Sequence, residues 1–221
     1  MNDIIDYLSG KKIIITVGHY GTGKTNLAVN FAVKLKYTLA DLDTVNPYFR
    51  GADNIKDLQN HGIDFIVPEF ANTNVDVPAV PAEINSVFAD KTKRAVFDAG
   101  GDGAGATVLG VFAEKIKQEN YEMIYVVNKY RPLISGAGPA AELAEEIGRK
   151  SKLKITSVIN NSNIGGLTTE KEILDSMDYA QKTADLIGAP LLCTTFSADV
   201  DFFEKKEYNI FRIKNYTKKL F

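Results

Sequence analysis

The chain has 221 residues, of which 45% are hydrophobic and 24% are charged, and its formal net charge at pH 7 is −2. A chain of this size and composition can bury a core of its own, so we expect one domain over residues 1–221. The small net charge and the mixing of acidic and basic residues exclude a global field that would draw the protein to nucleic acid or to an anionic membrane.

Cysteine usage and the absence of long apolar stretches limit the class of protein further. Cys193 is the only cysteine, which excludes an internal disulfide and a CxxC metal site and is compatible with a reducing cytosol. No stretch approaches the roughly 20 apolar residues of a membrane span. The acidic residues near the start are not typical of a signal peptide. We therefore expect a soluble, cytoplasmic protein.

Short apolar runs alternate with longer amphipathic stretches along the chain. The short runs, rich in Ile, Val, Phe and Tyr, predict strands at residues 12–18, 37–41, 63–68, 94–100, 121–128, 154–160 and 190–196. The longer stretches predict helices at residues 24–36, 55–60, 82–89, 106–119, 138–150 and 169–187. This alternation predicts a three-layer α/β fold, in which a mainly parallel central sheet has helices on both faces. The ligands of such sheets bind at the carboxyl ends of the strands.

The segment GHYGTGKT, residues 18–25, fits the phosphate-binding pattern G-x-x-x-x-G-K-[ST]. It lies between a predicted strand and a predicted helix, which is the context that a P-loop requires. Its backbone N–H groups and the helix dipole attract phosphates, Lys24 adds a positive charge, and the Thr25 hydroxyl can bind Mg²⁺. We therefore predict a nucleoside triphosphate site formed by Gly18, Tyr20, Gly21, Thr22, Gly23, Lys24, Thr25 and Asn26.

Two aspartates, Asp41 and Asp43, follow the second predicted strand. Because they are two positions apart in an extended segment, both carboxylates can face the phosphates. One would hold Mg²⁺ through water and the other would orient the attacking water. The alternative is a solvated turn that Asp43 caps.

The predicted strand at residues 94–100 contains Asp98 and leads into a segment with four glycines at positions 100, 101, 103 and 105. Asp98 fits a magnesium ligand that acts through coordinated water. The glycines, Gly101 among them, would let the backbone approach a γ-phosphate.

The order of a P-loop, a D-x-D after the second strand and a strand that ends in D-x-G-G resembles the MinD, ParA and Mrp-like ATPases, the deviant-Walker, SIMIBI-class branch of P-loop NTPases. The resemblance covers residues 13 to about 196. It implies binding of ATP and Mg²⁺, ATP hydrolysis, and in many members a homodimer that sandwiches the nucleotide. It also implies that Asp43 positions water and that Asp41 and Asp98 lie at magnesium-binding positions, with Lys24 and Asp43 as the catalytic pair.

One position departs from the family pattern G-K-G-G-x-G-K-[ST], whose extra lysine reaches the phosphates of the partner subunit. His19 stands in its place, with Tyr20 next to it. A histidine is shorter than a lysine and is mostly neutral at pH 7, so it is a poor cation across a dimer. We therefore expect slow turnover, and any dimer could use another face. The alternative is a histidine that only fills space beside Tyr20.

Later strand ends bear on the choice of base. VVNKYRP resembles the start of a guanine-reading N-K-x-D, but Arg131 stands where the aspartate should accept hydrogen bonds, and an arginine cannot accept. Adenine is therefore favoured. Asn160 and Asn161 match the adenine-reading position of the family, because an amide can pair with both N6 and a ring nitrogen. The alternative is an asparagine turn at the start of a loop.

The C-terminal residues 207–221 mix aromatic and basic side chains. A terminal strand and helix that pack on the sheet explain this composition better than a membrane anchor does. Three functions stay open: an ATPase switch, which the sequence favours; a metabolic enzyme resembling dethiobiotin synthetase, with a substrate pocket under residues 68–83; and a nucleotide-binding module without turnover. The sequence predicts neither a protein partner nor a pathway.

Overall fold

The computed structural model describes residues 4–43, 59–66, 82–100, 103–200 and 208–216. Within these residues one sheet has the strand order β3-β2-β4-β1-β5-β6-β7-β8, and every neighbouring pair is parallel. The strands are β1 (Ile13–Val17), β2 (Thr38–Asp41), β3 (Phe65–Ile66), β4 (Ala95–Asp98), β5 (Tyr121–Val127), β6 (Ser157–Asn160), β7 (Leu191–Ser197) and β8 (Ile210–Ile213). The predicted α/β class and the parallel sheet are confirmed.

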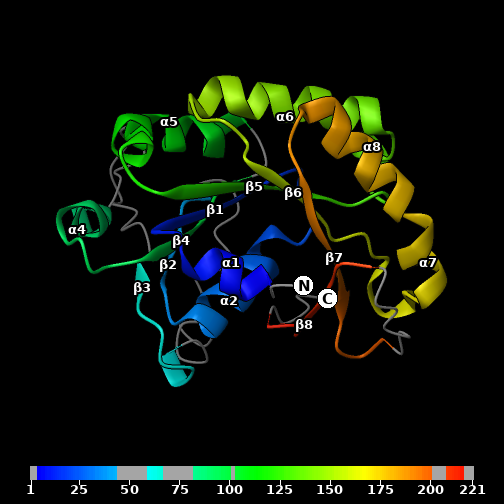
Figure 1. The fold of residues 1–221 in the computed structure, drawn as a ribbon, viewed down its shortest axis with the longest axis horizontal. Coiled ribbons are helices and arrows are strands. Elements are labelled where there is room, and N and C mark those ends of the chain that lie inside the picture. Colours follow the sequence, from blue (N-terminus) through cyan, green and yellow to red (C-terminus); the bar gives the residue numbers. More distant parts are fainter. Residues whose placement is uncertain (1–3, 44–58, 67–81, 101–102, 201–207, 217–221) are drawn as a thin grey trace, which may run out of the picture.

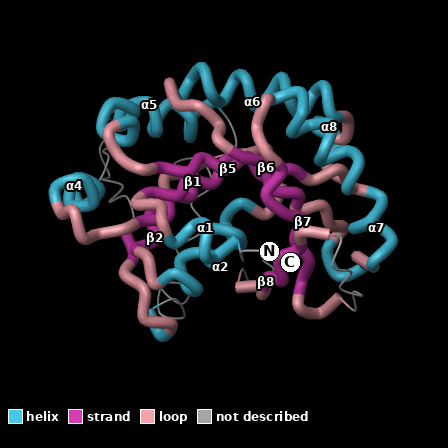
Figure 2. The backbone as a smooth tube through the Cα atoms, in the orientation of Figure 1, coloured by secondary structure: helices cyan, strands magenta, loops and turns pink. Residues whose placement is uncertain are grey.

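Helices cover both faces of the sheet and complete three layers (Figure 1). On one face lie α4 (Ala82–Ala89), α5 (Gly103–Lys117), α6 (Ala137–Ser151) and α8 (Met177–Ile187). On the other face lie α1 (Ile4–Ser9) and α2 (Lys24–Leu35). Figure 2 shows the strands as a continuous layer between the two groups.

The central strand β1 shows why the sequence forms this arrangement. Ile13 and Ile15 are buried in the core under α5 and α6, whereas Ile14 is buried in the core under α2. A strand with helices on both faces must be apolar on both sides, so it reads as a continuous apolar run. This explains why β1 has the sequence IIITV.

Most differences from the predicted elements lie at the ends of the chain and after β6. The helix α1 was not predicted. The helix predicted at residues 169–187 is two helices, α7 (Glu170–Asp175) and α8. Ser176 lies at the break, where its hydroxyl donates to Ile173 O (2.7 Å) and accepts from the Asn160 amide (2.8 Å). The C-terminal segment supplies β8, the strand that the packing alternative expected.

Two short 3₁₀ helices, η2 (Pro132–Ile134) and η3 (Gly165–Leu167), lie in the loops after β5 and β6. The helix predicted at residues 55–60 and the irregular stretch at residues 68–83 fall largely outside the described residues. None of the helices that the structure describes combines the length and the apolar character needed to cross a bilayer.

Candidate phosphate-binding site

The loop between β1 and α2 turns tightly against the neighbouring strand. Gly18 has φ 143°, and a Cβ atom there would lie 2.3 Å from the carbonyl oxygen of Val126 in β5. Gly23, with φ 86°, is the residue before the first turn of α2, and no side-chain hydrogen bond caps the helix there. Only glycine fits both positions without strain. The first N–H groups of α2 are therefore directed at the loop, as the P-loop pattern predicts.

Three donors in this loop converge on one oxygen atom, the carbonyl oxygen of His19. Lys24 Nζ donates to it at 3.1 Å, Thr22 Oγ1 at 2.9 Å and Thr22 N at 3.3 Å. Lys24 is only 7% exposed, so its ammonium group is held inside the loop. A phosphate oxygen could accept from the same donors, which makes the loop interior a site for an anion.

The side chain of His19 is directed at its own loop. Its Nδ1 lies 2.9 Å from the carbonyl oxygen of Tyr20, and a hydrogen bond there requires the proton on Nδ1. Tyr20 is 67% exposed. A role of His19 toward a second subunit stays a prediction.

Three polar side chains form a row at the carboxyl ends of neighbouring strands. In the strand register Asp41 of β2 pairs with Asp98 of β4, and Asp98 pairs with Thr16 of β1. All three residues are buried, and Thr16 Oγ1 donates to Asp98 Oδ1 at 3.2 Å. The row lies beside the loop that β1 enters, so the structure brings together the predicted loop and the two predicted magnesium ligands.

Burial raises the pKa of the Asp98 carboxyl to about 6. The charge of Lys24 and hydrogen bonds from Thr25 and Thr16 oppose this rise, and the charge of Asp43 adds to it. Removal from water disfavours the ionised carboxylate, and the neighbouring cation and hydroxyls do not offset that cost. A further cation at Asp98 would therefore stabilise its charged form.

Asp43 lies at the glycine-rich segment after β4. A Cβ atom on Gly100 would lie 3.1 Å from Asp43 Oδ1, so the carboxylate is against the backbone of Gly100. The backbone N–H of Asp43 donates to Asp41 Oδ1 at 3.0 Å, which makes Asp41 the residue that caps this turn. Gly101 lies outside the described residues. The water-positioning role of Asp43 stays a prediction.

The two candidate base-reading asparagines are bonded to protein groups. The Asn160 amide donates to Ser176 Oγ and to Thr194 Oγ1, and its oxygen accepts from Ser162. The Asn161 amide donates to the carbonyl oxygen of Thr22, inside the P-loop, at 2.6 Å. Contact of either residue with a base stays a prediction.

Asn26, predicted to contact nucleotide, is bonded to the C-terminal segment after β8. Its amide donates to Lys214 O at 3.0 Å, and its oxygen accepts from Tyr216 N at 2.8 Å. Asn30, one helical turn later, donates to the same Lys214 O at 2.8 Å and accepts from Lys214 N at 2.9 Å. Their i, i+4 spacing places both asparagines on one face of α2, so that both reach the same segment.

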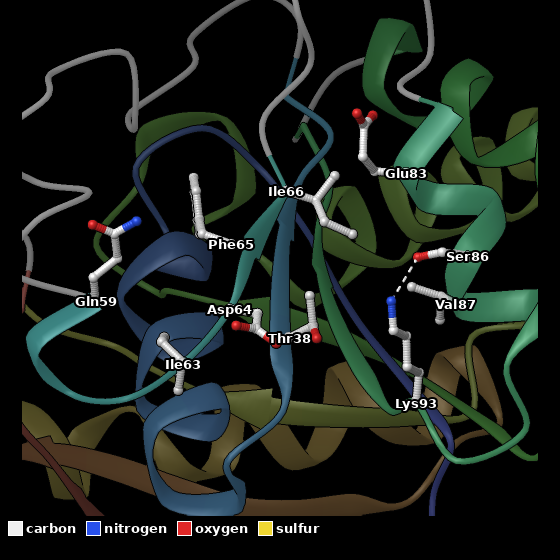
Figure 3. Close-up of a pocket in the computed structure, with 10 residues that line it drawn as sticks. All are labelled: Thr38, Gln59, Ile63, Asp64, Phe65, Ile66, Glu83, Ser86, Val87 and Lys93. Atoms are coloured by element: carbon white, nitrogen blue, oxygen red, sulfur yellow. Dashed lines mark hydrogen bonds between the residues drawn. The ribbon is translucent and has the colours of Figure 1, made fainter.

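A cavity of 370 Å³ lies elsewhere, between α4 and the edge strand β3 (Figure 3). Lys93 and Ser86 form a hydrogen bond of 3.1 Å across one side of it. The cavity is separate from the phosphate loop, because β2 and β4 lie between β3 and β1 in the sheet. Its lining residues are Thr38, Gln59, Ile63, Asp64, Phe65, Ile66, Glu83, Ser86, Val87 and Lys93.

No protein-family model matches the sequence, and no curated protein matches it. The fold is similar to that of chloroplast FtsY from Physcomitrella patens, with a TM-score of 0.55 and 14% identity over 83% of this chain and 58% of that chain. It is also similar to the cell division protein FtsY from Thermotoga maritima, with a TM-score of 0.50 and 17% identity over 90% of this chain and 64% of that chain. These similarities show that the chain shares the fold of the two FtsY structures, with a parallel sheet between layers of helices. It spans less than two thirds of the length of either FtsY chain.

Sequence reasoning missed one side chain at this P-loop. Arg131, in the loop after β5, donates from Nε to the carbonyl oxygen of Gly21 at 2.7 Å. The sequence showed only that Arg131 could not accept a hydrogen bond from guanine. Nothing in the local pattern indicated a contact with the P-loop 110 residues earlier.

Proposed function

We propose that the protein binds ATP with Mg²⁺ at the P-loop and hydrolyses the ATP slowly, as a nucleotide-dependent switch. The observation that carries the proposal is the convergence of Lys24 and Thr22 on one oxygen position, beside the buried row of Thr16, Asp41 and Asp98. Cationic and N–H donors suit phosphate, and the adjacent carboxylates suit the counter-ion of a nucleotide.

The residues at the row fit Mg²⁺ by the chemistry of their donors. Mg²⁺ prefers oxygen ligands and usually takes several of them from water and substrate phosphates. The Thr25 hydroxyl and the carboxylates of Asp41 and Asp98 supply oxygen atoms at this end of the sheet. No group of three or more His, Cys, Asp or Glu residues suited to a metal occurs in the described part of the chain, so phosphates would complete the coordination. When bound, Mg²⁺ would neutralise charge on the phosphates.

The other residues have defined tasks in this proposal. Lys24 exchanges the carbonyl oxygen of His19 for β- and γ-phosphate oxygens, and Asp43 holds the attacking water. Arg131 cannot accept hydrogen bonds from the guanine edge, which favours adenine. Because His19 replaces the family lysine, turnover is slow, and any dimer would use another face.

Calorimetric titration with Mg-ATP and with Mg-GTP, combined with product analysis, tests the proposal. We expect Mg-ATP to bind more tightly than Mg-GTP. We also expect phosphate to be released from ATP without a second substrate. Turnover that requires a small carboxylic acid would indicate the metabolic enzyme, and tight binding without turnover would indicate a binding module. Preference for GTP would contradict the assignment of the base.

The variant Asp43→Asn tests the hydrolysis step. The amide keeps the size of the carboxylate but polarises water poorly, so we expect nucleotide binding to be retained while hydrolysis slows by roughly ten- to a thousandfold. The measurement is the single-turnover rate with saturating Mg-ATP. If the variant loses nucleotide binding while any bound ATP is still hydrolysed at the normal rate, Asp43 is a magnesium-binding or structural residue.

A further inference from the structure

We propose that Arg131 and Asn161 act together as positioning residues that turn the backbone N–H groups of the P-loop toward the phosphates. We call this pair the loop clamp. The inference rests on the proposed function, because it concerns the same nucleotide site. It predicts that affinity for phosphate groups alone, without a base, depends on two side chains outside the P-loop.

The loop clamp holds two consecutive carbonyl groups. Arg131 Nε donates to Gly21 O at 2.7 Å, and Asn161 Nδ2 donates to Thr22 O at 2.6 Å. Arg131 follows β5 and Asn161 follows β6, and these strands lie on the side of β1 opposite to β4 and β2. The P-loop is therefore held from one side by the clamp, while Asp41 and Asp98 lie on its other side.

Peptide geometry turns this outward pull into inward-directed donors. The C=O of one residue and the N–H of the next belong to one planar trans unit and point in opposite directions. When Gly21 O and Thr22 O are held outward, the N–H groups of Thr22 and Gly23 are directed inward. The Thr22 N–H does point inward, because it donates to His19 O, the oxygen that Lys24 also contacts.

The Asn161 amide is locked in its orientation. Its side chain is 5% exposed, and its Oδ1 accepts from the hydroxyl of Thr195, which is 1% exposed on β7. A flipped amide would place Asn161 Oδ1 against the carbonyl oxygen of Thr22, two acceptors with no hydrogen between them. The donor end is therefore fixed on Thr22 O, and each polar end of the amide already has a protein partner.

The P-loop sequence leaves room for the clamp. A Cβ atom at position 21 would lie 3.0 Å from the Arg131 guanidinium carbon, and one at position 23 would lie 2.3 Å from Asn161 Nδ2. Glycines at these two positions thus admit both side chains as well as the backbone turn. The sequence suggested that Asn161 contacts a base, but the geometry assigns its amide to the P-loop.

The test compares ligands with and without a base. Calorimetry measures the binding of Mg-tripolyphosphate and Mg-ATP to the wild type, Asn161→Asp, Arg131→Ala and Arg131→Lys. Asn161→Asp keeps the side-chain shape but cannot donate, and Arg131→Ala removes the donor. We expect each of these two variants to bind both ligands about tenfold or more weakly than the wild type does. This is the effect of losing one charge-assisted or buried hydrogen bond. Arg131→Lys retains a donor and should recover most of the affinity.

Lys129→Ala is the matched control for Arg131→Ala. Lys129 lies in the same loop, but its ammonium group donates to Asp175 O and not to the P-loop. This variant should bind both ligands like the wild type. Melting curves without ligand identify variants that do not fold, and the half-buried Arg131 keeps the test usable if Asn161→Asp does not fold.

The outcomes separate the clamp from the alternatives. If Asn161→Asp and Arg131→Ala weaken ATP but leave tripolyphosphate unchanged, both residues read the base and the clamp is wrong. If Arg131→Lys binds as poorly as Arg131→Ala, the donor to Gly21 is not what matters, and the inference is again wrong. A wild type that binds neither ligand would contradict the proposed function itself.

Discussion

Each end of the sheet buries a carboxylate on a strand that neighbours β1, but the pKa values of the two carboxylates shift in opposite directions. Asp98 ends β4 at the phosphate side and is 2% exposed; Glu122 lies near the start of β5 and is 1% exposed. Burial raises the pKa of Asp98 to about 6. Burial also acts to raise the pKa of Glu122, but the contacts with Lys11, Thr156 and Tyr7 hold that pKa below its usual range.

The difference lies in the partners. Glu122 Oε2 receives Tyr7 Oη at 2.7 Å and Lys11 Nζ at 2.9 Å, and Glu122 Oε1 receives Thr156 Oγ1 at 2.7 Å. Both oxygen atoms are therefore satisfied, and the group joins α1 to the sheet. Asp98 has Lys24 and two hydroxyls nearby, yet its charge is still disfavoured. At the amino end of the sheet the buried carboxylate is fully paired. At the carboxyl end its charge stays disfavoured, and we expect an added cation to stabilise it.

The largest expected effect is at the phosphate end. Lys24→Ala removes the ammonium group that converges on the loop interior, so we expect Mg-triphosphate binding to weaken by about 2–3 kcal/mol, roughly a hundredfold. Calorimetry measures this change. The melting temperature without ligand serves as the control and should change little. Unchanged affinity would mean that this loop does not bind phosphate. The proposed contrast between a ligand-binding end and a purely structural end of the sheet would then be wrong.

Glu122→Gln addresses the amino end. It leaves Lys11, which is 18% exposed, without its ion pair, and we expect the free energy of unfolding to fall by about 2 kcal/mol. Nucleotide affinity should not change. Urea unfolding and calorimetry measure the two quantities. A variant that binds nucleotide more weakly while it remains folded would show that the two ends are coupled.

The pKa of Glu122 gives the same end a defined pH dependence. Because its folded pKa lies below that of an ordinary glutamate, its stabilising contribution is present above the usual glutamate pKa and is lost as the pH falls through the folded value. Glu122→Gln should therefore differ from the wild type in stability near neutral pH and approach it in acid. A constant difference down to low pH would contradict the assignment.

In the absence of nucleotide, Asp98→Asn should change the free energy of unfolding in the opposite direction to Glu122→Gln. The amide removes a disfavoured charge, so we expect unfolding of the free protein to cost about 1 kcal/mol more at pH 7. Binding of Mg-ATP should weaken, because a carboxylate is lost from the magnesium side. For the wild type, affinity should also fall below about pH 6, where Asp98 becomes protonated, and the variant should lack this step. Destabilisation like that of Glu122→Gln would remove the contrast between the ends.

The smallest effect is expected at His19. In His19→Lys a longer, charged side chain replaces one that contacts its own loop, and the ATPase rate should rise and depend more on protein concentration. Initial rates over a range of protein concentrations measure this. Identical curves would mean that position 19 does not reach the phosphates of a second subunit.

The sequence predicted those features whose cause is local or follows from parallel strands. The P-loop chemistry lies within eight consecutive residues, 18–25, and Asp41 and Asp98 meet because the ends of adjacent parallel strands meet. The clamp could not be predicted, since Arg131 and Gly21 are 110 residues apart and Asn161 and Thr22 are 139 apart. The break at Ser176 likewise depends on Asn160, a residue of another element.

The contacts of Asn26 and Asn30 with the segment after β8 have a consequence for the order of folding. They join residues that are 184 to 190 positions apart, so the helix that starts the phosphate site contacts a segment that is synthesised long after it. During synthesis Asn30, which is buried in the folded protein, stays without Lys214 until the segment after β8 has been made. Contacts of such long range also slow folding. The nascent protein therefore completes the surroundings of its P-loop helix only after β8 and the residues that follow it have been synthesised.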